Sequence, residues 1–145
     1  MKCKVEGFGL IEVLVSMLIL GVGILGIIGL QLNALKYNQT AAFRSHATFL
    51  AYDIADQMRA NAVDALAGNY SIGLTDSAPA GSGIANTDLR EWKMAMARQL
   101  PAGNGSVSKN GDIYSITVQW DESKSGGEST QQFEFDTRLC ERDCL

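Results

Sequence analysis

The sequence predicts an α+β protein in which one long N-terminal helix packs against a small antiparallel sheet of about three or four strands. Three observations lead to this fold class. Residues 8–30 are an unbroken apolar run, residues 31–67 continue it with helix-forming residues and no proline, and the C-terminal third alternates apolar with polar side chains. The first two features indicate one continuous helix, and the third indicates strands.

The apolar run is long enough to cross a membrane as a helix. Its 23 residues would measure roughly 35 Å at about 1.5 Å per residue, and the hydrocarbon core of a bilayer is about 30 Å thick. Lys2 and Lys4 precede the run and favour a cytoplasmic N-terminus. The rest of the chain is therefore expected to face the periplasm or the exterior.

Glu12 is the only ionisable residue in this run. A charge in the hydrocarbon costs about 2.5 to 3.5 kcal/mol on insertion scales, so a membrane helix keeps one when a partner satisfies it. We expect that partner on another chain, although the chain's own N-terminus is also within reach if a leader is removed. The sequence leaves both partners open.

Cleavage between Gly7 and Phe8 is the processing event that the sequence favours. A secretory signal peptide has an apolar core of about 7 to 15 residues followed by a small-x-small site, whereas residues 31–40 read QLNALKYNQT. Cleavage before Phe8 would leave the membrane helix on the product. The new amino group would then lie one helical turn from Glu12, or near the Glu12 of a neighbouring helix, where the two charges partly neutralise each other.

Residues 31–67 are expected to form the amphipathic half of the long helix, with Gly68 as its stop. Apolar residues recur there at steps of three and four, which indicates packing on a globular head. These positions are Leu35, Ala42, Phe43, Ala47, Leu50, Ala51, Ile54, Met58 and Ala62. Asp56 and Arg59 are spaced to form an i,i+3 pair. Asp53 and Asp56 are predicted to be a solvated or subunit-facing surface and not a catalytic pair.

The head is predicted to occupy residues 68–145. Residues 68–86 are rich in Gly, Ser, Ala and Asn and indicate a mobile connecting loop. A short helix capped by Asn86 or Thr87 follows and ends before Pro101. Its core-facing residues are expected to be Leu89, Trp92, Met96 and Leu100. Strands are then expected over residues 105–109, 112–120 and 132–139, with Asn110-Gly111 as a two-residue hairpin turn.

Composition and cysteine positions narrow the function further. The net charge of −4 argues against nucleic acid as the main partner. Cys3 lies in the leader, so cleavage would leave Cys140 and Cys144, which we expect to form a disulfide in an oxidising periplasm. Two thiolates and the distant His46 do not suggest a metal site. No catalytic or cofactor-binding constellation is present in the sequence, so we predict a structural protein without a cofactor.

The segment Gly7-Phe8-Gly9-Leu10-Ile11-Glu12-Val13 resembles the type III signal of type IV pilins and pseudopilins. The resemblance implies cleavage after Gly7 by a prepilin peptidase, N-methylation of Phe8 and a role for Glu12 in docking the subunit into a filament. It also implies four regions: a leader over residues 1–7, a membrane and assembly segment over 8–30, the amphipathic half of the helix over 31–67 and a periplasmic head over 68–145.

The segments LAYDIADQMRAN, LPAGNGSV and YSITVQWDE extend the resemblance to the minor pilins of the type IV pilus-modification family. This implies an inner-membrane protein that joins a minor-pilin priming and tip complex, starts pilus assembly and supports adhesin display, twitching motility and adhesion. The implied partners are other minor pilins, the major pilin, prepilin peptidase, the inner-membrane assembly platform and a tip adhesin.

Two other functions compete with this interpretation. A pseudopilin of a type II secretion system shares the signal and the helix. An adhesive or DNA-uptake module would need a basic or aromatic surface strip, and the head has no basic run. The segment from Gly21 to Gly26 spells G-x-G-x-x-G, but inside a membrane helix it does not indicate a dinucleotide site. Its glycines, with Gly29, favour close contact between helices over a site where the helix unwinds, although the sequence does not separate the two.

Overall fold

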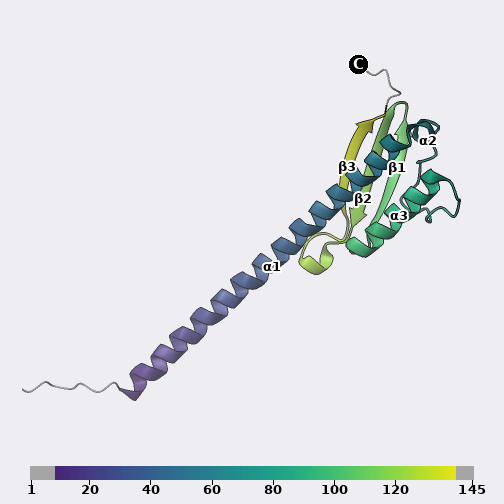
Figure 1. Ribbon diagram of the computed structural model, residues 1–145. Coiled ribbons are helices and arrows are strands. Elements are labelled where there is room, and N and C mark those ends of the chain that lie inside the picture. The colour runs from purple at the N-terminus through teal and green to yellow at the C-terminus, as the bar shows by residue number, and fades with distance from the viewer. Residues whose placement is uncertain (1–8, 140–145) are drawn as a thin grey trace, which may run out of the picture. The chain divides into compact units, whose positions relative to one another are not determined.

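The computed structural model describes residues 9–139, and the α+β class is confirmed (Figure 1). The chain forms two compact units, one ending at Asn38 and one beginning at Gln39. The helices are α1 (Leu10–Ala60), α2 (Ala62–Leu66) and α3 (Ile84–Gln99). The strands are β1 (Asn104–Asn110), β2 (Ile113–Trp120) and β3 (Gln131–Arg138), with a 3-10 turn, η1 (Ser123–Ser125), before β3. This arrangement is consistent with a type IV pilin-like fold.

The first unit contains the N-terminal part of α1 and has no buried side chain among its described residues. α1 is one 51-residue helix that continues through all four glycines between residues 21 and 29. By length and composition it can cross a membrane, with a mean hydropathy of 2.7 over its most apolar window. Its apolar surface is therefore available to lipid or to other helices.

The second unit contains the C-terminal part of α1, which covers one side of the core. Six buried residues belong to it: Ala47, Leu50, Ala51, Ile54, Ala55 and Met58. The predicted apolar stripe is thus confirmed over this stretch. It was wrong for Leu35 and Ala42, which are exposed, Leu35 at 64 %. Periodicity alone does not tell where along a helix the partner surface begins.

The long helix ends earlier than residue 67. Asn61 leaves the helical region with φ −117° and ψ 53°, and α2 follows as a separate short helix. The Asn61 side-chain amide donates to Asp64 Oδ2 at 2.8 Å and to the Tyr70 hydroxyl at 3.2 Å. Such local bonds let asparagine compete with a continuous helix. Gly68, with φ +86°, follows the end of α2, so it terminates this short helix, and its predicted role as the stop of the long helix was wrong.

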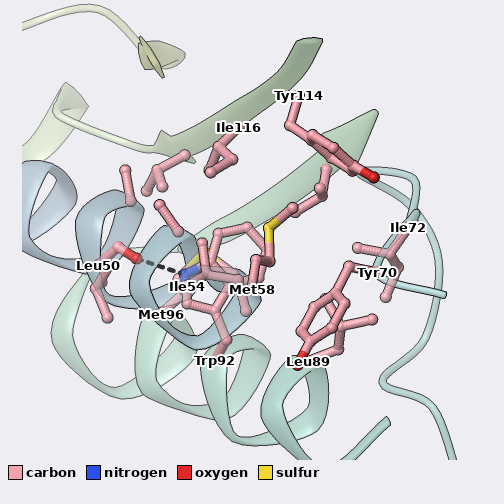
Figure 2. Packing of buried hydrophobic residues seen from close by; sticks show 14 of the residues in the cluster. Leu50, Ile54, Met58, Tyr70, Ile72, Leu89, Trp92, Met96, Tyr114 and Ile116 are labelled. Carbon is pink, nitrogen blue, oxygen red and sulfur yellow. Dashed lines mark hydrogen bonds between the residues drawn. The ribbon is translucent and has the colours of Figure 1, made fainter. Parts of the chain in front are cut away.

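α3 begins at Ile84, before the residues expected to cap it. Gly83 is the N-cap, and the Thr87 hydroxyl donates to the Gly83 carbonyl at 3.1 Å from inside the first turn. The predicted apolar face is confirmed, since Leu89, Trp92, Met96 and Leu100 are all buried. The indole Nε1 of Trp92 donates to the Leu50 carbonyl at 2.8 Å and so ties α3 to α1 (Figure 2).

The three strands form one antiparallel sheet in the order β1-β2-β3. Asn110 pairs with Ile113, so the hairpin turn is Gly111-Asp112 and not Asn110-Gly111. Gly111 has φ +61°, the conformation that a two-residue turn needs at its first position. The correction shifts the pairing by two residues, which leaves the same side chains on each face. Accordingly one face of β2 is still buried, with Tyr114, Ile116, Val118 and Trp120 on it.

The segment expected to be only a connecting loop also contributes to the core. Tyr70 and Ile72 are buried, and both belong to the hydrophobic cluster drawn in Figure 2. Ile72 and Val107 exchange two backbone hydrogen bonds of 2.9 Å, which attaches this segment to β1. Lys93 of α3 fastens the same segment by donating to the carbonyls of Gly73 at 3.0 Å and Leu74 at 3.2 Å.

Candidate assembly site on the first helix

Glu12 lies in the first turn of α1, where the exposed backbone N–H groups of a helix start favour a negative charge. Its own backbone N–H donates to the Gly9 carbonyl at 3.0 Å, and Ser16 Oγ donates to the Glu12 carbonyl at 2.7 Å. The ion pairs within residues 9–139 are Arg44–Glu122 and Arg59–Asp56. The Glu12 carboxylate thus has no cationic partner within that range and can pair with a group outside it.

Small residues share the face of α1 that carries Glu12. At about 100° per residue, Ser16, Gly23 and Gly26 lie within about 40° of Glu12 around the helix axis, as do the larger Ile19 and Leu30. A shallow groove of about 250 Å³ lies beside Glu12 and Ser16. The rest of its lining, Val13, Met17 and Leu20, is about 80° to 140° from Glu12 around the axis. A Cβ added at Gly23 or Gly26 would meet no atom within 4 Å. Another helix can therefore approach this face closely at the two glycines.

The predicted processing and disulfide sites fall outside the described residues. Gly7 and Phe8 precede them, and Cys140 and Cys144 follow them. Cleavage after Gly7, N-methylation of Phe8 and the disulfide therefore stay predictions. The docking role of Glu12 is likewise a prediction, although Glu12 itself lies in the described helix.

Asp53, near the end of α1, lies at a groove between α1 and α3. This groove has a volume of about 510 Å³ and includes Asp53, Gln57 and Glu91 in its lining. Gln57 Nε2 donates to Asp53 Oδ2 at 3.2 Å. Burial, with smaller contributions from the nearby Asp56 and Asp88 carboxylates, raises the pKa of Asp53 above its usual value.

Asp56 belongs to a different set of contacts. Arg59 Nη1 donates to Asp56 Oδ1 at 2.6 Å, which confirms the predicted i,i+3 pair. Arg59 Nη2 also donates to Thr137 Oγ1 at 2.8 Å and so connects α1 to β3. Asp53 thus accepts from Gln57, and Asp56 pairs with Arg59, so each carboxylate has its own partner.

A buried carboxylate that the sequence did not single out supports the β2–β3 connection. Glu122 is only 2 % exposed, and its Oε1 accepts from Trp120 Nε1 at 2.8 Å and lies 3.6 Å from Arg44 Nε. Residues 121–130 lie between two predicted strands, and a single glutamate in this polar stretch gives no sign of burial. The neighbouring Trp120, whose indole N–H needs an acceptor when buried, was the available signal.

Within residues 9–139, no group of three or more His, Cys, Asp or Glu side chains is placed to hold a metal ion. Tyr70 is the residue whose titration is most strongly shifted there. Burial, and secondly a hydrogen bond from its hydroxyl to Asp88, raises the pKa of Tyr70 to about 12. The Tyr70 hydroxyl therefore stays protonated at neutral pH and acts as a structural donor.

Residues 2–28 match the family described as the prokaryotic N-terminal methylation motif. The chain carries a prepilin-type methylation motif. This match supports a type IV pilin or pseudopilin, and hence a structural protein that associates in general with other pilus components and with prepilin peptidase. The motif and the apolar helix fit membrane anchoring before assembly. Comparison with curated proteins and with solved structures gives no match.

Proposed function

We propose that this chain is a minor pilin of a type IV pilus, similar to the pilus modification protein PilV. The observation that carries the proposal is the methylation motif at the start of a 51-residue helix whose later part is built into a compact head. The resemblance of residues 50–61, 100–107 and 114–122 to minor pilins supports the more specific assignment. The chain would join the priming and tip complex that starts assembly and helps display an adhesin.

The proposed cycle uses the two units of the chain in different ways. Before assembly the apolar part of α1 anchors the chain in the inner membrane with the head in the periplasm. Prepilin peptidase cleaves after Gly7, and Phe8 becomes the methylated N-terminus. The face of Glu12, Ser16, Gly23 and Gly26 then packs against neighbouring pilin helices, where Glu12 pairs with a cationic group and its desolvation is offset.

The test is deletion of the gene in strains with and without the pilus retraction motor. Surface pili are counted after shearing, and type II secretion is assayed in the same strains. We expect pili to be lost when retraction is active and to return when the motor is absent, because a priming complex raises the rate of initiation against retraction. Normal numbers of pili in the deletion strain with an active motor contradict the proposal.

The second candidate is a pseudopilin of a type II secretion system. The methylation motif supports it equally well, since pilins and pseudopilins share that motif. The same experiment separates the two functions. Loss of secreted enzymes with unchanged pili assigns the chain to the secretion system, whereas loss of pili with unchanged secretion assigns it to the pilus.

A further inference from the structure

The two edges of the sheet are covered to different extents. β1 has Ile72 paired to its outer side, and α3 lies along it. In Figure 1, β3 is at the opposite edge of the sheet. In the part of the chain that the structure describes, no strand pairs with the outer side of β3. An eight-residue strand with a free edge is a template for pairing with another chain.

The alternation of backbone hydrogen bonds shows which groups β3 offers. Ile72 bonds both the N–H and the C=O of Val107, so these backbone groups point away from β2. Val107 pairs with Ile116, and the backbone groups of Ile116 therefore point away from β1 and toward β3. Phe135 lies opposite Ile116, so the backbone N–H and C=O of Phe135 bond β2. The Leu139 N–H donates to the Asp112 carbonyl at 3.4 Å, as the same alternation requires. The backbone groups that point outward on β3 thus belong to Gln132, Glu134, Asp136 and Arg138.

The side chains of this edge differ on the two faces of the sheet. Gln132, Glu134, Asp136 and Arg138 are exposed on the face that looks away from the core. A strand added to β3 would lie about 4.8 Å away. Its solvent-facing side chains would lie beside the two acidic residues of this face, Glu134 and Asp136. Lys or Arg at alternate positions of that strand would pair with Glu134 and Asp136.

The core-facing side of the same edge is aromatic. Phe133 and Phe135 are half-buried, and the Phe135 ring lies 4.6 Å from the ring of Tyr52 on α1. Tyr52 is 46 % exposed, and Phe49, one turn earlier, is 64 % exposed. The inward side chains of an added strand would cover Tyr52 and Phe135, so apolar residues fit there.

A second copy of this chain fits the edge less well than a basic segment. An antiparallel β3–β3 pair must align the outward-pointing residues, which are Gln132, Glu134, Asp136 and Arg138. Two of the registers that align at least three of them place acid against acid with no opposite charge across from it. The third opposes Asp136 to Asp136, although Glu134 then faces Arg138 of the other copy. A segment with Lys or Arg at alternate positions pairs with both acidic residues and leaves no like charges opposed.

We propose that the outer edge of β3 binds an extended segment of another protein in which Lys or Arg alternates with apolar residues. The segment adds a fourth strand to the sheet, its basic side chains pair with Glu134 and Asp136, and its apolar side chains cover Tyr52 and Phe135. This inference rests on the described head alone and does not depend on the chain's assignment to the pilus or to the secretion system.

The test places the photo-crosslinking amino acid p-benzoylphenylalanine at Gln132 in the full-length chain, expressed in its own cells. We expect an adduct that maps to a segment with basic residues at alternate positions. Glu134→Lys should reduce the adduct at least tenfold, because it replaces attraction by repulsion. The matched control Glu91→Lys makes the same charge change on the exposed surface of α3 and should leave the adduct unchanged.

A second pair of variants tests the backbone. Proline is tolerated at an edge position whose N–H faces outward, so Glu134→Pro removes one donor from the free edge and keeps the β2–β3 ladder. Glu134→Gln removes the same charge and keeps the donor. We expect less adduct with Glu134→Pro than with Glu134→Gln, at equal amounts of the chain. No adduct at Gln132, an adduct with a second copy or with a segment lacking alternate basic residues, or equal adducts in all variants, overturns the proposal.

Discussion

At the scale of single residues, Glu12 is the group whose removal should separate processing from assembly. We expect Glu12→Ala to leave cleavage intact and to abolish incorporation, because the partner charge in the membrane would lose about 2.5 kcal/mol or more of compensation. The measurement is the amount of mature chain in membranes and in sheared pili. Ser16→Ala is the control on the same face, since it removes a hydroxyl without removing a charge. Wild-type amounts of the Glu12→Ala chain in sheared pili would refute the docking role.

Asp53 should make the head less stable at neutral pH than it would be with a neutral side chain. Its folded-state pKa is raised above the unfolded value of about 3.9, so the folded state binds the proton more tightly. The stability that this tighter proton binding adds to the folded state is fully present below the unfolded pKa of Asp53 and is lost as pH rises through its folded pKa. Asp53→Asn keeps an oxygen acceptor for Gln57 and avoids that loss.

We therefore expect Asp53→Asn to stabilise the head at pH 7 by less than about 1 kcal/mol, since the side chain is partly solvated. The gain should vanish below about pH 4. Urea unfolding of the full chain in micelles at the two pH values measures it. The control Asp56→Asn breaks the pair with Arg59 and should not stabilise. Equal stabilisation by Asp53→Asn at both pH values contradicts the explanation.

At the scale of elements, the contact between β1 and α3 depends on Gly105. A Cβ at this position would lie 2.6 Å from Trp92 Cη2, 2.7 Å from Met96 Sδ and 2.8 Å from the Thr117 carbonyl. Gly105→Ala should therefore push α3 away from the sheet and destabilise the head by about 1 to 3 kcal/mol. In the control Gly29→Ala, outside the head, the added Cβ would meet no atom within 4 Å. Thermal unfolding should show a loss for Gly105→Ala alone, and equal melting temperatures for both variants contradict the packing argument.

The elements that the sequence predicted well are those that depend on local pattern. The strands, the apolar face of α3 and the apolar stretch of α1 follow from periodicity within one segment. Other features depend on contacts between distant segments. Ile72 is buried because it pairs with Val107, and Glu122 is buried because Trp120 and Arg44 approach it. The turn at Gly111 was misplaced by one residue because Asn-Gly and Gly-Asp both suit a two-residue loop.

The candidate functional residues also differ in whether the sequence alone reveals them. Glu12 could be recognised because a single carboxylate in a long apolar run is unusual, and the methylation motif contains it. The free edge of β3 could not be recognised, because the sequence does not say which strand ends the sheet. Its acidic residues, Glu134 and Asp136, are typical of the solvent face of any strand.

At the scale of the whole molecule, the division at residue 38 predicts that the head folds without the apolar part of α1. Within residues 9–139, every buried residue of the core lies between Ala47 and Leu139, and the first unit has no buried side chain there. A fragment beginning at Gln39 keeps the whole core. Its melting temperature should lie within about 4 °C of that of the full chain in micelles, a shift that corresponds to at most about 1 kcal/mol in a domain of this size.

A second fragment beginning at Ile54 provides the contrast for this experiment. It lacks Ala47, Leu50 and Ala51, and with Leu50 it loses the carbonyl that accepts from Trp92. Loss of one buried leucine alone costs about 2 to 5 kcal/mol, and this fragment loses a full side of the core. We expect it to be unfolded by near-UV circular dichroism. If the fragment from Gln39 is also unfolded, the membrane part of α1 contributes to the stability of the head, and the division of the molecule into an independent head and a separate assembly helix is wrong.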